Sequence, residues 1–414
     1  MIMIAGTAQG LPSLPAGDEA PDPLRTEVTI FPSMGFSTDL GLGLGALGVI
    51  ARFHPDHDPF RWRLAFQGNV HVKTQPGGGL LATHTDDYLQ LELPGLADGK
   101  LRLRLEAAFR LHSNAGYFGL GNASVEEQPW EDIDGEVDPE GFERATRFNQ
   151  YSRTYPTLRA DVWIDLPPPF RVFAGGSLVW NWIQVYDASR LALDLGGDSG
   201  GDAADLLVGT DRHGVLEGYA GVMLDTRDHE FAPTRGWFAD LSIRGGPLLE
   251  IPGGYAGLNG AVRAYRRIWG PYLVLAARLL ADVLLGTPPF YELSHFGGLF
   301  PNHGPGGGRS LRGAPHMRYH GKVKLIANLE LRSKLVSFRL FKLPSSLGVT
   351  LFGDTGRVWA DTRPHPDLDG RGGALKYGIG GGLRLQMGET FVVRGDYGWS
   401  PDGWGIYLDV NHVF

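Results

Sequence analysis

The chain has 414 residues, of which 61 are glycine and 28 are proline, and its formal net charge is −8. It contains no cysteine, which excludes a disulfide framework and a thiolate metal site. The acidic balance and the lack of a basic, aromatic-rich patch give no support to nucleic-acid binding. Abundant glycine together with 11% aromatic residues favours many strands joined by turns over packed helices.

Residues 1–26 are predicted to be a lead-in, and residues 27–414 a single folded domain. Residues 9–26 hold four prolines and several acidic side chains, a composition typical of a flexible segment. The first residues are too few for a signal peptide, although Gly6-Thr7-Ala8 fits the small-x-small cleavage site at the end of one. A residual signal peptide and a plain disordered start both remain open.

The clearest strand pattern lies in residues 101–112, where apolar and polar side chains alternate. Three arginines and a glutamate share the polar parity, which suits a wet barrel interior better than the face of a soluble sandwich. The same alternation occurs in residues 62–73 and 322–332. Because no apolar run reaches the roughly 18 residues of a spanning helix, a membrane crossing would have to use strands.

Sixteen strands are predicted from these patterns and the turns between them: 26–36, 38–52, 61–73, 80–93, 100–112, 147–165, 170–187, 214–227, 236–246, 256–269, 271–286, 320–333, 347–359, 375–387, 390–399 and 404–414. The links at 113–146, 188–213, 287–319 and 360–374 are long, and the others are short apart from 334–346. Long loops on one side and tight turns on the other are typical of outer-membrane barrels. The predicted fold is all-β, a 16-stranded antiparallel transmembrane barrel.

The aromatic residues and the last residue of the chain indicate a location in the outer membrane. Trp269 and Tyr272 flank one turn, and Trp399 and Trp404 flank a turn on the opposite rim, as in interfacial girdles. The chain ends in an alternating strand that closes on Phe414, an ending typical of bacterial outer-membrane barrels. We expect a multi-pass barrel in the outer membrane of a Gram-negative bacterium.

A glycine-rich segment at 303–313 separates two of these strands and carries Arg309 and Arg312. Five glycines and a proline exclude a helix there. We expect this loop to fold back into the lumen, where Arg312 meets Glu330 and Asp354 on the polar parity of the strands that follow.

Three segments resemble motifs of the BamA/TamA-type outer-membrane assembly superfamily, the bacterial surface antigen barrels. Leu311-Arg312-Gly313 resembles the V/I-R-G-F/Y signature of the inward-folded loop, and residues 351–359 are similar to the F-x-D-x-G-x-V-W strand. Residues 225–236 resemble the D-x-R-D…P-T-x-G hairpin through Asp225, Arg227, Asp228, Pro233 and Gly236.

The resemblance implies a sixteen-stranded barrel with the signature loop in its lumen, Arg312 as the signature arginine, and Glu330 and Asp354 as its carboxylates on the wall. Ala314 departs from the family, which has an aromatic residue there, so the loop tip is expected to pack less firmly. About 26 residues precede the first strand, too few for a POTRA domain, and the chain therefore resembles a POTRA-lacking branch.

The expected function is non-enzymatic protein insertion or translocation through a weak seam between the first and last strands. Pro32 removes a hydrogen-bond donor from the first strand, and Gly403 and Gly405 are expected to loosen the last. Two alternatives remain open, a gated pore for ions or small polar solutes and an anchor that scaffolds surface or lipoprotein partners. Expected partners are outer-membrane lipids, including lipopolysaccharide, and other outer-membrane proteins or lipoproteins. No cofactor is expected.

Residues 197–201 match the G-D-S-G-G motif around the serine of some proteases. Ser199 is not expected to be catalytic, because no strand–turn–helix elbow surrounds it and no matched His and Asp precede it. The same loop contains four aspartates whose oxygens could bind Ca²⁺, although a solvated loop is favoured and no metal site is predicted: Asp194, Asp198, Asp202 and Asp205.

Overall fold

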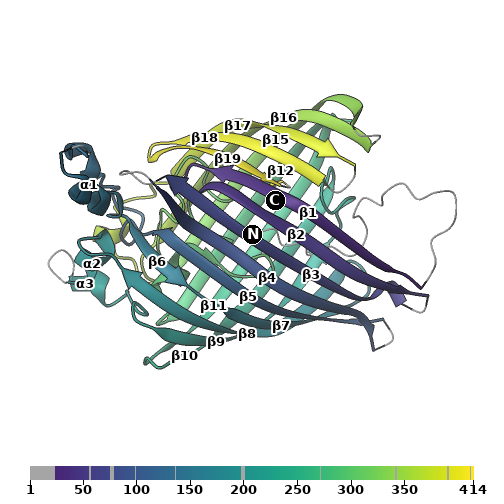
Figure 1. Cartoon of the computed structure of the whole chain (residues 1–414), viewed down its shortest axis with the longest axis horizontal. Coiled ribbons are helices and arrows are strands. Elements are labelled where there is room, and N and C mark those ends of the chain that lie inside the picture. The colour runs from purple at the N-terminus through teal and green to yellow at the C-terminus, as the bar shows by residue number, and fades with distance from the viewer. Residues whose placement is uncertain are drawn as a thin grey trace.

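Sixteen antiparallel wall strands close into a barrel in the computed structural model, as predicted (Figure 1). The structure describes residues 24–414 except 56, 75–78, 98, 136, 197–200, 271, 341–342, 389–390 and 411. The lead-in predicted for residues 1–26 therefore lies mostly outside the described residues. Among the described residues, no helix is long and apolar enough to cross a membrane.

The wall strands follow one another around the barrel in sequence order. β6 and β7 together form a single wall strand, because both pair with β5 on one side and β8 on the other. The strands are β1 (Thr26–Ser37), β2 (Gly41–His54), β3 (His57–Thr74), β4 (Leu80–Leu96), β5 (Leu101–Gly116), β6 (Gln150–Thr154), β7 (Thr157–Asp165), β8 (Phe170–Val185), β9 (His213–Asp225), β10 (Gly236–Leu249), β11 (Gly254–Trp269), β12 (Leu273–Gly286), β15 (Val323–Leu340), β16 (Leu343–Trp359), β17 (Lys376–Met387), β18 (Phe391–Ser400) and β19 (Gly403–Val410).

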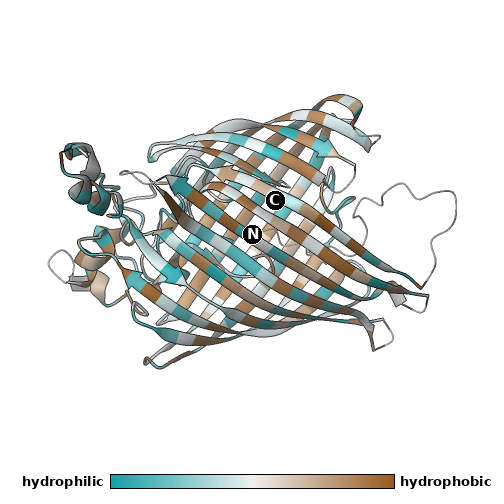
Figure 2. Ribbon diagram, viewed as in Figure 1, coloured by the Kyte–Doolittle hydropathy of each residue, from teal (hydrophilic) through white to brown (hydrophobic). Residues whose placement is uncertain are grey.

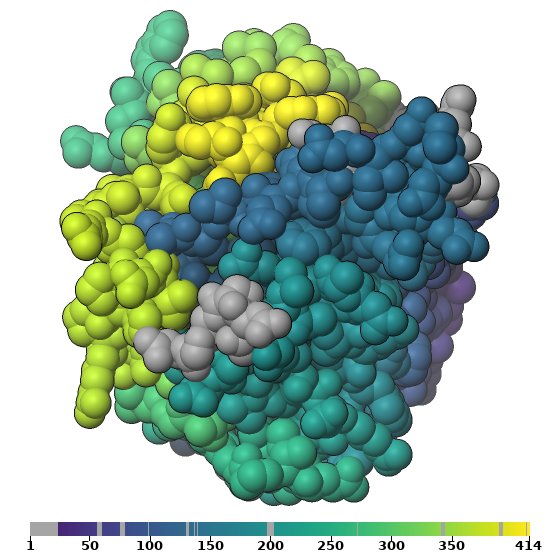
Figure 3. Space-filling view, turned by 90° about the vertical axis from the view of Figure 1, so that its left-hand side faces the viewer, coloured from purple at the N-terminus to yellow at the C-terminus, as the bar shows by residue number. Residues whose placement is uncertain are grey.

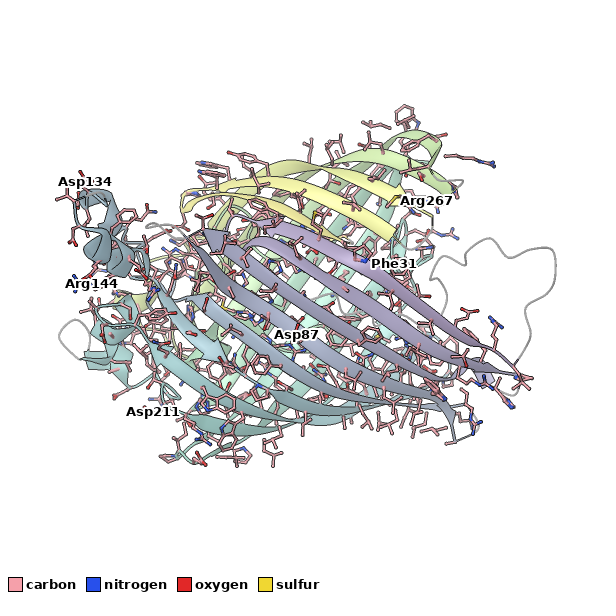
Figure 4. All side chains as sticks on the ribbon, in the orientation of Figure 1. Phe31, Asp87, Asp134, Arg144, Asp211 and Arg267 are labelled. Carbon is pink, nitrogen blue, oxygen red and sulfur yellow. The ribbon has the colours of Figure 1, made fainter. Side chains whose placement is uncertain are left out.

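The long loops carry short helices at one end of the barrel, on the left of Figure 1. Asp134 and Arg144 in Figure 4 mark a loop that projects beyond this end, whereas Arg267 lies towards the opposite, short-turn end. The remaining elements are η1 (Pro129–Asp132), α1 (Pro139–Thr146), α2 (Arg190–Leu195), α3 (Gly201–Ala204), η2 (Phe290–Ser294), β13 (His295–Phe296), β14 (Asn302–His303) and α4 (Pro366–Asp369).

The two faces of each strand differ as the sequence predicts, and apolar and polar residues alternate along the ribbons (Figure 2). In β5, Leu105 is 41% exposed on the outer face, whereas Arg104 on the inner face is 7% exposed. Arg104 is paired with Asp161 of β7 at 2.7 Å. Apolar side chains thus face the membrane, while paired charges line the lumen.

One predicted connection is wrong. The sequence predicts a long link at 334–346, but β15 and β16 continue through this region as a hairpin. The register shifts between Lys334 and Val336, which leaves Leu335 as an extra residue in the ladder. A bulge of this kind breaks the period-two alternation from which strands are predicted.

The last strand is also shorter than predicted. It ends at Val410, and residues 412–414 lie outside the strand that was predicted over 404–414.

Replacing Leu105 by Arg should destabilise the folded barrel by about 2–4 kcal/mol if its side chain lies near the bilayer midplane, because the guanidinium would face hydrocarbon. Urea unfolding in lipid vesicles, followed by tryptophan fluorescence, measures this loss. The lumen-facing Glu106→Gln is the matched control on the same strand and should change stability much less. Equal losses in the two variants would contradict the assignment of the faces.

Candidate functional site in the barrel lumen

The long connection between β12 and β15, residues 287–322, folds back into the lumen, and we call it the inner loop. Leu311 and Arg312 are fully buried in it, although neither belongs to a strand. Gly313 has a φ of +97°, and a Cβ at this position would lie 2.5 Å from the carbonyl carbon of Trp399. Glycine is therefore required where the loop passes against the wall.

The guanidinium of Arg312 lies between two carboxylates of neighbouring strands. It donates to both oxygens of Asp354, from Nε at 2.7 Å and from Nη2 at 2.8 Å, and to Glu330 from Nη1 at 2.7 Å. The backbone N–H of Arg312 also donates to Asp354 at 3.1 Å. Its guanidinium carbon lies 3.4 Å from the centre of the Phe352 ring. The structure thus brings together the three residues that the sequence selects.

A wider charge network surrounds this contact. Asp396 of β18 lies 3.5 Å from Arg312 and accepts hydrogen bonds from Arg384 and Arg394. Burial alone would lower the pKa of Arg312, but the carboxylates around it, with Asp354 first, raise its pKa above the ordinary value. The guanidinium is therefore charged at neutral pH, and the inner loop carries a positive charge into the lumen.

The sequence does not identify the partners of several members of this network. Asn328 donates to Asp354 at 2.7 Å and to the Ser310 carbonyl at 2.6 Å, and it accepts from Arg278. Arg309, the other arginine of the loop, pairs with Asp409 of β19 at 2.6 Å. Asn328 and Asp409 lie on the lumen parity of their strands, so parity could have identified them as candidates, but it could not have identified their partners.

Ala314 does not leave the loop tip loose. It is 1% exposed and belongs to a buried cluster with Phe296, Leu311 and Tyr319. Side chains from elsewhere in the inner loop therefore occupy the space around this small residue.

The hairpin motif lies at the short-turn end, between β9 and β10. Arg227 pairs with both oxygens of Asp225, at 2.9 and 2.7 Å. Asp228 accepts the N–H groups of Thr234 and Arg235 and the Arg267 guanidinium. Pro233 is buried, and Gly236 has a φ of +105°, which favours glycine. The motif stabilises its own turn and lies outside the Arg312 network.

A model of the Omp85 superfamily domain matches residues 209–407, the part of the chain that holds the hairpin, the inner loop and its carboxylates. Residues 209–407 form an Omp85 superfamily domain. This confirms the family that the motifs predict and the location of the barrel in a Gram-negative outer membrane. A search of curated protein sequences gives no match.

Two solved structures resemble this Omp85 barrel in fold. BamA from Haemophilus ducreyi lacking POTRA domains 1–3 gives a TM-score of 0.60 at 14% identity, over 94% of this chain and 70% of that one. CdiB from Escherichia coli gives a TM-score of 0.55 at 12% identity, over 95% of this chain and 68% of that one.

The seam of the Omp85 barrel, between β1 and β19, is short. Among the described residues it holds two register pairs, Phe36 with Leu408 and Ser37 with Tyr407, and Thr38 donates to the Ile406 carbonyl at 3.2 Å. By contrast, β1 pairs with β2 along its entire length. The first ten residues of β1 therefore have an edge that β19 does not cover.

The last residues of the chain occupy the lumen beside the Arg312 network. Phe414 is 7% exposed, and its ring lies 4.9 Å from the guanidinium carbon of Arg278 and 5.1 Å from that of Arg332. Arg332 also donates to the main-chain oxygen of Phe414 at 2.8 Å and to Glu330 at 2.8 Å. Phe414, which the sequence places at the end of a wall strand, instead contacts the residues that hold the inner loop.

The described residues of the aspartate-rich loop give little support to a Ca²⁺ site. Ser199 and Asp198 lie outside the described residues. Asp194 accepts a hydrogen bond from Tyr117 at 2.8 Å and one from Arg190 at 3.0 Å, so its oxygens already have partners.

Replacing Arg312 by Ala should destabilise the barrel by about 3–5 kcal/mol, because two buried carboxylates lose their cation. Arg309→Ala is the matched control on the same loop and should cost about 1 kcal/mol or less, because its ion pair is partly solvated. Urea unfolding in vesicles and trypsin cleavage of the inner loop measure the loss of stability in each alanine variant. Arg312→Lys keeps the charge but loses the bidentate hydrogen bonds, so its loss of stability should lie between those of the two alanine variants. Equal stability of the two alanine variants would contradict the geometry.

Replacing Phe414 by Ala should release the chain end from the lumen. If the register of the seam continued, Phe31 would lie opposite Val413. Disulfide formation between Phe31→Cys and Val413→Cys should therefore rise several-fold in the Phe414→Ala background. The pair Phe36→Cys and Leu408→Cys, already adjacent, is the control and should cross-link equally in both backgrounds. An unchanged yield for the first pair would show that Phe414 does not hold the chain end.

Proposed function

We propose that this barrel inserts or translocates protein segments at the outer membrane by opening sideways at the β1–β19 seam. The observation that carries the proposal is the short seam together with the space behind it. A cavity of about 370 Å³ lies in the lumen, and its lining includes both sides of the seam, with Ser33 and Gly35 from β1 and Tyr407 and Asp409 from β19. Opening the seam would join this cavity to the membrane.

The uncovered edge of β1 supplies the chemistry for receiving a segment. Its backbone N–H and C=O groups can pair with an incoming extended chain, as in other cases of strand addition. Val28, Ile30 and Met34 are exposed beside this edge and suit a segment that will face lipid. Phe31 marks this part of β1 in Figure 4.

The inner loop would keep the rest of the wall in place while the seam moves. Its Arg312 contacts carboxylates of β15, β16 and β18, so these strands are tied to one another through the loop. Barrels of this superfamily are generally assembly or transport factors without catalysis, which supports a non-enzymatic role here. We propose outer-membrane lipids, including lipopolysaccharide, and other outer-membrane proteins or lipoproteins as partners.

The structure gives less support to an open pore for small solutes. Loops drawn in blue, teal and yellow-green meet over the barrel mouth at the long-loop end (Figure 3). Many of the lumen charges that would set selectivity are already engaged, such as Arg102 with Glu92 and Arg110 with Asp86.

A disulfide across the seam should abolish function. Because the chain has no native cysteine, Phe36→Cys and Leu408→Cys introduce the only two thiols, and their Cα atoms are register partners. Oxidation should block rescue of the outer-membrane protein content in a strain that lacks the native protein, and reduction should restore it.

The matched control for this experiment is a disulfide between Tyr397→Cys and Ile406→Cys, which joins β18 to β19 inside a fully paired stretch of wall. It should leave rescue unchanged. Sideways opening would be refuted if the locked seam rescued as well as the unlocked one.

A further inference from the structure

A row of histidines faces the lumen on three neighbouring strands. His71 of β3 is the register partner of His84 of β4, which in turn is the register partner of His112 of β5. The ring centres are 5.4 Å apart in the first pair and 4.2 Å apart in the second. A strand face with three adjacent imidazoles has no role in the Arg312 network or in the seam.

The inner loop brings further imidazoles to this row. The ring of His303 lies 5.2 Å from that of His112, and the ring of His316 lies 6.3 Å from it. His303 and His316 are 5.8 Å apart, and His295 is 5.3 Å from His303. All of these rings border the same lumen cavity of about 370 Å³.

Several nitrogens in this cluster are buried without a hydrogen-bond partner, namely Nδ1 of His71, Nδ1 of His84 and Nε2 of His316. Burial, followed by the neighbouring imidazoles, holds the pKa of His303 well below its ordinary value, and burial lowers the pKa of His316 to about 4. These shifts favour the neutral form of both loop histidines, in which one ring nitrogen keeps a lone pair. A neutral imidazole with a free lone pair is the form that binds metal ions.

We propose that His112, His303 and His316 bind one divalent transition-metal ion of the zinc, nickel or copper class, which links the inner loop to β5. Imidazole nitrogens bind such ions at about 2.0–2.1 Å. Ring centres then lie about 3 Å from the ion and about 5–6 Å from one another. The three measured separations fall within or just above this range.

Binding requires the rings to turn. As the side chains stand, no three His, Asp or Glu side chains of the described residues converge as metal ligands. The adjoining cavity leaves room for rotation, and the unpartnered nitrogen of His316 loses no hydrogen bond by it. Tyr155, whose hydroxyl is 3.3 Å from Nε2 of His112, can accept the N–H of that ring once Nδ1 binds the ion.

The surrounding charges do not exclude a cation. Arg110 faces the cavity but is paired with Asp86 at 2.6 Å and with Glu106 at 3.0 Å. Arg153 lies against the rings of Tyr155 and Tyr291, 4.1 and 3.5 Å from their centres. Asp86 and Glu106 thus set two carboxylates against the single guanidinium of Arg110.

Titration with Zn²⁺ and Co²⁺ tests the proposal on full-length protein in detergent that carries no histidine tag. We expect calorimetry to show one ion per chain with micromolar or tighter affinity. Co²⁺ should give visible d–d absorption bands of a nitrogen-ligated site. His112→Gln and the double variant His303→Gln/His316→Gln should each weaken binding at least tenfold. The matched control His54→Gln, at the opposite end of β2 from the cluster, should bind as the native chain does.

Circular dichroism and heat-modifiable migration in SDS gel electrophoresis establish that each variant is folded. A loss of binding can then not be attributed to unfolding. Failure of the native chain to bind either ion would overturn the proposal. So would equal binding by the native chain and the double variant, because the ion would then be held elsewhere. Neither result would bear on opening of the seam, which the cysteine cross-links test separately.

Discussion

The rest of the structure depends on one buried cation, the guanidinium of Arg312. Placing a charge in a site with no solvent exposure is costly unless its hydrogen-bonding capacity is met by fixed acceptors. Glu330 of β15 and Asp354 of β16 accept its hydrogen bonds, and Asp396 of β18 adds a third carboxylate at 3.5 Å. Because a partial set of contacts would leave a buried charge uncompensated, the inner loop is either fully docked or displaced, with little stability in between.

This constraint distinguishes parts of the barrel by the contacts that hold them. The strands that contact Arg312 lie on one side, and the inner loop joins them through the lumen as well as through their ladders. β19 belongs with these strands, because it pairs with β18 and contacts the inner loop through Asp409 and Tyr407. Across the seam, the described residues of β1 and β19 are joined by the register pairs at Phe36 and Ser37 and by the hydrogen bond from Thr38. Gly405 also contributes to loop docking, because it leaves room for the Tyr407 ring, whose hydroxyl accepts from Gly313.

Much of the fold follows from period-two alternation, because each wall strand has lipid on one face and water or charge on the other. The same parity places Glu330 and Asp354 on the lumen face, where Arg312 reaches them. Parity fails where a strand gains a residue, as at Leu335, and it says nothing about a chain end that leaves the sheet, as at Phe414. It also could not rank Asp396 above other lumen acids, since only the folded loop determines which carboxylates a guanidinium reaches.

The inner loop and the chain end are bound, directly or through Glu330, by the same two side chains, those of Arg278 and Arg332. These contacts couple the Arg312 network to the seam. Arg332 donates to Glu330 and to the main-chain oxygen of Phe414, and Arg278 donates to Asn328 and to the Arg309 carbonyl. Residues 412–414 cannot pair with β1 while they occupy this position in the lumen. Docking of the inner loop and docking of the chain end are therefore coupled equilibria, and such coupling is reciprocal. A segment that displaces the chain end must also change the stability of the docked loop. Extension of the seam and docking of the loop are thus linked through two arginines.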